Sequence, residues 1–132
     1  MNKYFDYNIF YSRLKSQYKK HKKLIILYDF DDTVYSLNGI VDEEIVSLLR
    51  RWEPYACLIC YTVRTGKQVK FAKNILDREK IPYNYINRDM DGKVPKHGAK
   101  IYGNILLDDK CGMDMAYKAL SQLIDEIEKG EV

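Results

Sequence analysis

Three short apolar runs constrain the fold of this chain more than any other feature. They occupy residues 24–29, 56–61 and 104–107, and polar residues follow each of them. Continuous apolar runs of about four to eight residues are typical of strands that are buried on both faces of a sheet. We therefore expect three internal strands, and a weaker strand at 83–86.

Helical periodicity fills most of the remaining sequence. Apolar side chains recur every three or four residues over 3–21, 41–52, 65–81 and 116–127, which predicts amphipathic helices. Thr65 and Gln68 have the spacing of a capping box. Alternating strands and helices predict an α/β fold, a three-layer Rossmann-like parallel sheet with helices on both faces and an extra N-terminal helix.

The length of 132 residues suits one domain with a hydrophobic core. We expect an N-terminal basic amphipathic helix over 1–23 and a catalytic domain over 24–132. No apolar run approaches the roughly 20 residues of a membrane span, and the N-terminus lacks the apolar region of a signal peptide. A cytoplasmic protein with no membrane partner is the expectation.

The cysteines favour a reducing compartment. There are three of them, Cys57, Cys60 and Cys111, an odd number in a chain that is large enough to fold without disulfides. Cys57 and Cys60 fit the C-x-x-C pattern, but they lie within an apolar run. We favour small buried hydrophobic residues over a redox pair.

Charge is distributed unevenly along the chain. Residues 1–23 contain seven lysines or arginines and one acidic residue, whereas the remainder contains 15 basic and 18 acidic residues. The excess of positive charge is therefore confined to the N-terminal segment and does not indicate a general nucleic-acid-binding surface. Nucleic acid is a possible but less favoured partner of the lysines near the end of the first helix, which are Lys19, Lys20, Lys22 and Lys23. We expect them to stay in water while the aromatic side of the helix packs on the domain or on a second copy of the chain.

Acidic side chains gather where the apolar runs end. Asp29 and Asp31 follow the first run, and Asp108 and Asp109 follow the last. The carboxyl ends of parallel strands meet at one edge of the sheet, where ligands bind. Like charges at such short separations repel, and Mg²⁺ relieves the repulsion because it takes oxygen ligands. We prefer a magnesium site to the alternative, solvated loop acids.

This set of side chains suits phosphoryl transfer. One carboxylate can attack phosphorus as a nucleophile, and a second can exchange protons with the leaving group and with water. Thr62, which follows the second apolar run, offers a hydroxyl to a phosphoryl oxygen. A lysine can neutralise charge in the transition state.

The segment LIILYDFDDTV at 24–34 resembles the first motif of the haloacid dehalogenase-like (HAD) phosphohydrolases, an apolar strand followed by D-x-D-x-T. The resemblance implies Asp29 as the nucleophile and Asp31 as the general acid and base. It also implies that Thr33 braces the loop and contributes to substrate binding.

Two further segments extend this resemblance over most of the chain. CLICYT, at 57–62, is similar to the second HAD motif, and implies that Thr62 binds the phosphoryl group. KIYGNILLDDK, at 100–110, resembles the third and fourth motifs as small phage and bacterial members carry them. It implies Lys100 as the phosphate-stabilising lysine, with Lys96 as an alternative.

The resemblance also implies a metal centre. Mg²⁺ would be held by the Asp29 carboxylate, the Asp31 backbone carbonyl and Asp108, with Asp109 as a direct or water-mediated partner. Only 28 residues separate Thr33 from Thr62, and 37 separate Thr62 from Lys100. Neither gap can hold the cap domain of larger relatives, so we expect an open crevice that suits a large substrate or closure by a partner subunit.

Loop residues could line that crevice. Arg64 is a candidate for substrate binding, as are Arg88 and His97, although surface loops ordinarily carry such side chains. The identity and size of the phosphorylated substrate stay open, as does the oligomeric state.

Three functions are compatible with these residues. The first is a Mg²⁺-dependent phosphatase that forms a phosphoaspartate on Asp29. The second is a phospho-receiver signalling module, which needs a phospho-accepting aspartate at the end of the third strand, where only Asp89 lies nearby. The third is a degenerate binding protein that retains the HAD fold.

Overall fold

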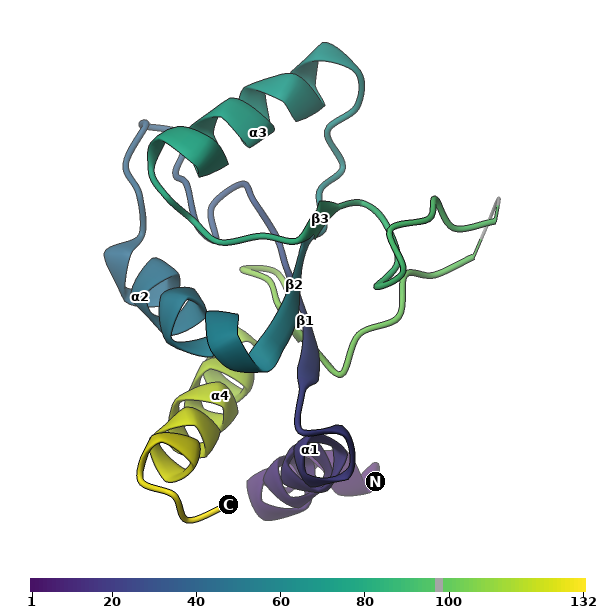
Figure 1. Ribbon diagram of the computed structural model, residues 1–132, viewed down its shortest axis with the longest axis vertical. Coiled ribbons are helices and arrows are strands. Elements are labelled where there is room, and N and C mark those ends of the chain that lie inside the picture. The colour runs from purple at the N-terminus through teal and green to yellow at the C-terminus, as the bar shows by residue number, and fades with distance from the viewer. Residues whose placement is uncertain (97–98) are drawn as a thin grey trace.

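The computed structural model describes residues 1–96 and 99–132, so His97 lies outside the described residues. Its centre is a parallel sheet with the strand order β3-β2-β1-β4 (Figure 1). The strands are β1 (Leu24–Tyr28), β2 (Ala56–Cys60), β3 (Tyr85–Ile86) and β4 (Ile105–Leu107). The fold class predicted from the sequence, a Rossmann-like parallel α/β sheet flanked by helices, is confirmed.

Four α-helices flank the sheet. They are α1 (Tyr7–His21), α2 (Glu43–Trp52), α3 (Lys67–Arg78) and α4 (Met113–Glu128), and a short 3-10 turn (Lys3–Phe5) precedes α1. Aspartates cap the first two helices, because Asp6 accepts hydrogen bonds from backbone N–H groups of α1 and Asp42 accepts one from α2.

The predicted capping box of α3 is wrong. Gly66 occupies the N-cap position with a φ of 53°, and no side chain caps the helix. A capping box needs the threonine itself at the N-cap. Thr65 lies one residue too early, so its spacing to Gln68 does not match the observed start of α3.

The strand order creates a switch point between β1 and β4. From β1 the chain moves outward on one side to β2 and β3, and then returns to pair β4 with the other side of β1. Tyr28 is in register with Leu107 of β4 and with Cys60 of β2. The residues that follow β1 and β4 are therefore neighbours at the position where open α/β sheets bind their ligands.

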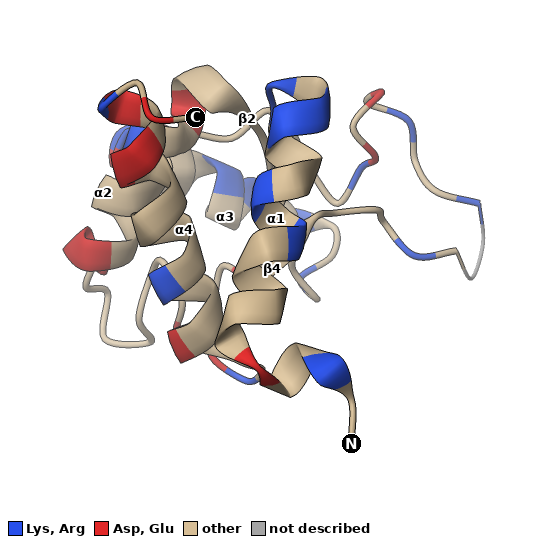
Figure 2. Cartoon of the chain, turned by 90° about the horizontal axis from the view of Figure 1, so that it is seen from below, with Lys and Arg blue, Asp and Glu red and all other residues tan. Residues whose placement is uncertain are grey.

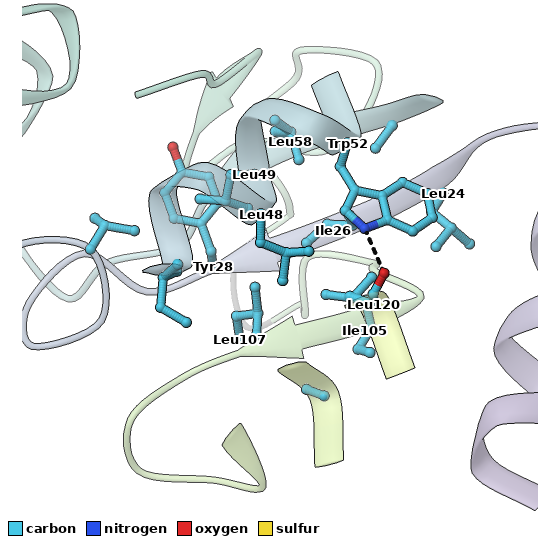
Figure 3. Close-up of a cluster of buried hydrophobic side chains, with 14 of the residues drawn as sticks. Leu24, Ile26, Tyr28, Leu48, Leu49, Trp52, Leu58, Ile105, Leu107 and Leu120 are labelled. Carbon is cyan, nitrogen blue, oxygen red and sulfur yellow. Dashed lines mark hydrogen bonds between the residues drawn. The ribbon is translucent and has the colours of Figure 1, made fainter. Parts of the chain in front are cut away.

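One face of the sheet and all four helices share the main hydrophobic core. Leu24, Ile26 and Tyr28 point into it from β1, and the fully buried Trp52 packs among these side chains (Figure 3). The Trp52 indole N–H donates to the Leu120 carbonyl at 3.1 Å, which satisfies its buried donor and ties α2 to α4.

The other face of the sheet has a smaller core. Leu27, Cys57 and Ile59 are buried there, and the residues packed against them lie on strands and on the connection from β3 to β4. Helices were expected on both faces, but this connection forms no helix in its described residues. It contains Gly92, Pro95 and Gly103 and lacks helical periodicity, so it covers the second face as a loop.

The aromatic side of the N-terminal helix packs on the domain, which was one of the two arrangements expected from the sequence. Tyr11, Leu14 and Tyr18 are buried in the main core, and the ring of Tyr18 meets that of Trp52 edge-on at 6.1 Å. The four lysines at and after its end are exposed. Helix α1 is thus an integral part of the fold.

The C-x-x-C cysteines are free and buried. Cys57 belongs to the smaller core and Cys60 to the main core, because positions three apart on a strand lie on opposite faces. Burial raises the pKa of both thiols. The pair therefore acts as packing and not as a redox centre, as the sequence indicated.

No helix among the described residues is long and apolar enough to cross a membrane.

Candidate active site

A tight turn directly after β1 presents the first carboxylates. The backbone N–H groups of Thr33, Val34 and Tyr35 all approach the Phe30 carbonyl, at 3.4, 3.2 and 3.2 Å. Asp32 adopts a left-handed conformation with φ 59°, which an aspartate tolerates better than most residues. Phe30 is fully buried in the main core, and its side chain therefore fixes the turn to that core.

Three carboxylates meet at the switch point. The Asp29 N–H donates to the Leu107 carbonyl at 2.9 Å, which extends the pairing of β1 and β4 by one residue. One carboxylate oxygen each from Asp29, Asp108 and Asp109 lie within 4.8 Å of one another. We call these three residues the acidic triad.

Thr33 connects the two halves of the triad. Its side chain is fully buried, and its Oγ1 lies 3.4 Å from Asp29 Oδ2 and 3.4 Å from Asp109 Oδ1. The same oxygen accepts a hydrogen bond from the Asp109 N–H at 3.1 Å. The hydroxyl therefore holds the loop after β4 against the turn after β1.

The triad is electrostatically strained. Burial raises the pKa of Asp29 from 3.8 to about 7, and a hydrogen bond with Asp109 and the charges of Asp108 and Asp109 add to this effect. Burial alone would raise the pKa of Asp109 too, but the hydrogen bond from Asp29 and the charge of Lys110 lower it overall. Asp29 is thus the member of this pair that binds a proton more readily.

The donor set of the triad fits a hard divalent cation. Carboxylate oxygens are the ligands that Mg²⁺ prefers, and it is usually bound by one or two carboxylates with further positions left for water and phosphate. A cation at this place would compensate the charges of Asp108 and Asp109, which add to the effect of burial on the pKa of Asp29.

The side chain of Asp31 does not join the triad. It forms a bidentate ion pair with Arg64, whose Nε and Nη2 lie 2.9 and 2.8 Å from the two carboxylate oxygens. The guanidinium also lies against the rings of Phe30 and Phe71, at 5.5 and 5.1 Å from their centroids. Asp31 and Arg64, which were both predicted as site residues, are therefore paired with each other.

Thr62 lies at the end of β2 in a fixed conformation. Its backbone N–H donates to Asn87 Oδ1, and Asn87 Nδ2 donates back to the Thr62 carbonyl, both at 2.8 Å. The hydroxyl accepts a hydrogen bond from the Arg64 N–H at 3.2 Å. Asn87 was not predicted as a site residue, although a polar residue directly after the third strand was a usable signal.

The lysines near the site differ in their contacts with the triad. Lys110 Nζ lies 3.8 Å from Asp109 Oδ2, and this lysine was not predicted as a site residue. Lys100 is exposed and lines a cavity of about 630 Å³ together with Tyr61 and Cys111. Within residues 1–96 and 99–132, no ion pair joins Lys100 or Lys96 to the triad.

Comparisons with known proteins bear on the fold. No protein-family model matches the chain, and no curated protein matches it. A solved structure of a conserved protein from Bacteroides thetaiotaomicron is similar, with a TM-score of 0.58 and 18% identity, over 83% of this chain and 93% of that chain. This likeness shows the fold alone.

Proposed function

We propose that the chain is a Mg²⁺-dependent HAD-like phosphatase, which hydrolyses phosphomonoesters through a phosphoaspartate on Asp29. One observation carries the proposal, namely the acidic triad at the switch point of the sheet. The D-x-D-x-T segment at 29–33, which resembles the first HAD motif, supplies its first member.

Several residues of the chain take part in the proposed reaction. A carboxylate oxygen of Asp29 attacks phosphorus while the bond from phosphorus to the leaving oxygen breaks. The leaving oxygen takes a proton from Asp31. Water then attacks the phosphoaspartate and returns a proton to Asp31, while the bond from phosphorus to Asp29 breaks and inorganic phosphate is released. Asp29, Asp108, Asp109 and the Asp31 carbonyl would hold Mg²⁺, which supplies positive charge to the phosphoryl oxygens.

Proton transfer sets a condition on this scheme. Asp31, which the HAD resemblance implies as the general acid, is paired with Arg64. Both carboxylate oxygens of Asp31 are bonded to the guanidinium and cannot reach the leaving oxygen at the same time, so this pair must open during turnover. Arg64 then becomes available to bind an oxygen of the substrate.

The test is phosphate release from p-nitrophenyl phosphate, with Mg²⁺ or with EDTA. Asp29→Asn should abolish release, because an amide is not a nucleophile toward phosphorus. The matched control is Asp114→Asn, since Asp114 is an exposed acid on α4 that pairs with Lys118 and lies outside the triad. Undiminished release by Asp29→Asn, or full activity in EDTA, would reject the proposal.

A second candidate is a phosphate-binding protein without turnover. The Asp31–Arg64 pair favours it, because the pair removes the proton donor from the site. In that case Mg²⁺-dependent binding of inorganic phosphate should be measurable by calorimetry while no ester is hydrolysed.

The phospho-receiver alternative is less compatible with the topology. A flavodoxin-like receiver has the strand order 2-1-3-4-5, which places the third strand beside the first, whereas β4 occupies that position here. The residue after β3 is Asn87, whose side chain is bonded to Thr62. Stable labelling by acetyl phosphate without turnover would revive this alternative.

A further inference from the structure

The cavity beside the acidic triad is not explained by phosphoryl chemistry alone. It has a volume of about 630 Å³ and extends along the β4 edge of the sheet. One wall comes from helix α1, which lies beside α4 at this edge (Figure 2). Phe10 and Arg13 of α1, Tyr61, Lys100, Tyr102 and Met115 line it.

The cavity is lined in part by residues that neighbour the triad in the sequence. Its lining includes Tyr61, the residue before Thr62, and Cys111, whose N–H bonds to the Asp108 carbonyl at 3.2 Å. Leu27 and Leu106 form part of its wall, and Asp29 and Asp108 follow them by two residues. Alternation along a strand places residues two apart on the same face. A substrate with its phosphate at Asp29 therefore has this cavity beside it.

The lining has a specific chemical character. Its two charged side chains, Arg13 and Lys100, are both cationic, and Phe10, Tyr61 and Tyr102 supply aromatic rings. Arg13 lies 5.3 Å over the Phe10 ring. Its Nε has no hydrogen-bond partner in the described chain, and no carboxylate of the described residues forms an ion pair with its guanidinium.

We propose that this cavity binds the leaving group of the phosphomonoester, and that the leaving group is a nucleotide. The base stacks on the aromatic rings, and a second phosphate interacts with Arg13 and Lys100. The aromatic rings favour a base over a bare sugar, and the described lining contains no carboxylate that would repel a second phosphate. The volume falls within the range of small-molecule sites.

The substrate class that follows is a nucleotide with two phosphates. A free nucleoside bisphosphate and the phosphorylated end of a single-stranded oligonucleotide share this chemistry. The inference rests on the proposed function for the placement of the reacting phosphate at Asp29. It also gives α1 a part in the site, through Phe10 and Arg13.

Binding can be measured separately from turnover. In the Asp29→Asn protein with Mg²⁺, the Kd of adenosine 3′,5′-bisphosphate is measured by calorimetry, with methyl phosphate and adenosine as the reference ligands. We expect the bisphosphate to bind at least tenfold more tightly than either reference. A 3′-phosphorylated tetranucleotide then tells the two sources apart, since tighter binding than the bisphosphate assigns the oligonucleotide end.

Variants locate the binding site. Arg13→Gln and Tyr61→Ala should each raise the Kd of the bisphosphate about tenfold, and Tyr61 is exposed enough that its loss leaves the fold intact. Lys19→Gln is the matched control, since Lys19 is an exposed cation on the same helix that does not line the cavity. Thermal unfolding of each variant checks folding.

The outcomes separate this inference from the proposed function. Bisphosphate binding no tighter than that of methyl phosphate, or unchanged in both Arg13→Gln and Tyr61→Ala, overturns the inference, even if p-nitrophenyl phosphate is hydrolysed. Tight binding that these variants weaken, with no phosphate released from any ester by the wild type, overturns the phosphatase and retains the nucleotide site.

Discussion

Replacement of Asp29 by asparagine should stabilise the metal-free protein at neutral pH. In the folded protein the carboxyl holds its proton more tightly than in the unfolded chain, because its pKa is about 7 rather than 3.8. Unfolding therefore releases a proton between these pH values, and the free energy of unfolding falls as pH rises from about 4 to about 7. Asparagine has no charge to gain, so the variant escapes this loss.

The size of the effect follows from the two pKa values of Asp29. The difference between 3.8 and about 7 corresponds to about 4 kcal/mol at 1.36 kcal/mol per pH unit. The lowered pKa of Asp109 acts in the opposite direction, so the net loss in the wild type is smaller. We expect Asp29→Asn to be more stable than the wild type by about 2 kcal/mol at pH 8 and to differ little at about pH 4.

The assay is urea unfolding in EDTA at about pH 4, 6 and 8, for the wild type, Asp29→Asn and the surface control Asp114→Asn. Mg²⁺ added at pH 8 should stabilise the wild type and the control more than Asp29→Asn, which keeps only Asp108 and Asp109 of the triad, since a ligand that binds only the folded state raises its stability. Parallel pH profiles for the wild type and Asp29→Asn would refute the argument that Asp29 is crowded by the other two carboxylates.

Three further changes test how the site is held. Thr33→Val should lower the free energy of unfolding in urea by about 1 to 3 kcal/mol, because the Asp109 N–H loses its hydrogen-bond acceptor. Thr33→Ser keeps the hydroxyl and should retain most of that stability. Gly103→Ala should cost about 1 to 3 kcal/mol, because a Cβ there would lie 2.5 Å from Leu27 Cγ, and an unchanged midpoint would contradict the close packing of the loop. Trp52→Phe should cost about 3 kcal/mol by thermal unfolding, since it removes a buried hydrogen bond and leaves a cavity in the core, and a loss below about 1 kcal/mol would contradict it.

The sequence was sufficient to predict that acidic residues gather at one edge of the sheet. Asp29 and Asp108 each follow a buried strand, and parallel strands bring such positions to the same edge whatever their order. Their direct adjacency, however, depends on the pairing of β1 with β4. That pairing comes from the tertiary packing of the helices, which no local pattern in the sequence encodes.

Loop conformation accounts for what the sequence did not predict. Arg64 meets Asp31 across 33 positions of sequence, because the residues after β2 turn back over the Phe30 and Phe71 rings. Periodicity describes helices and strands but not such turns. The same limit applies to the start of α3 at Gly66 and to the loop that covers the second face of the sheet.

Charges of opposite sign lie close to each other at the β4 side of the sheet. Burial and the charges of Asp108 and Asp109 raise the pKa of Asp29, while Arg13 and Lys100 line the adjoining cavity. No ion pair among the described residues joins the two groups, although a direct pair would relieve both. This separation costs stability unless a cation binds one side and an anion the other. A phosphate ester with a second anionic group, bound together with Mg²⁺, satisfies both requirements, and for this reason the two proposals are best tested together.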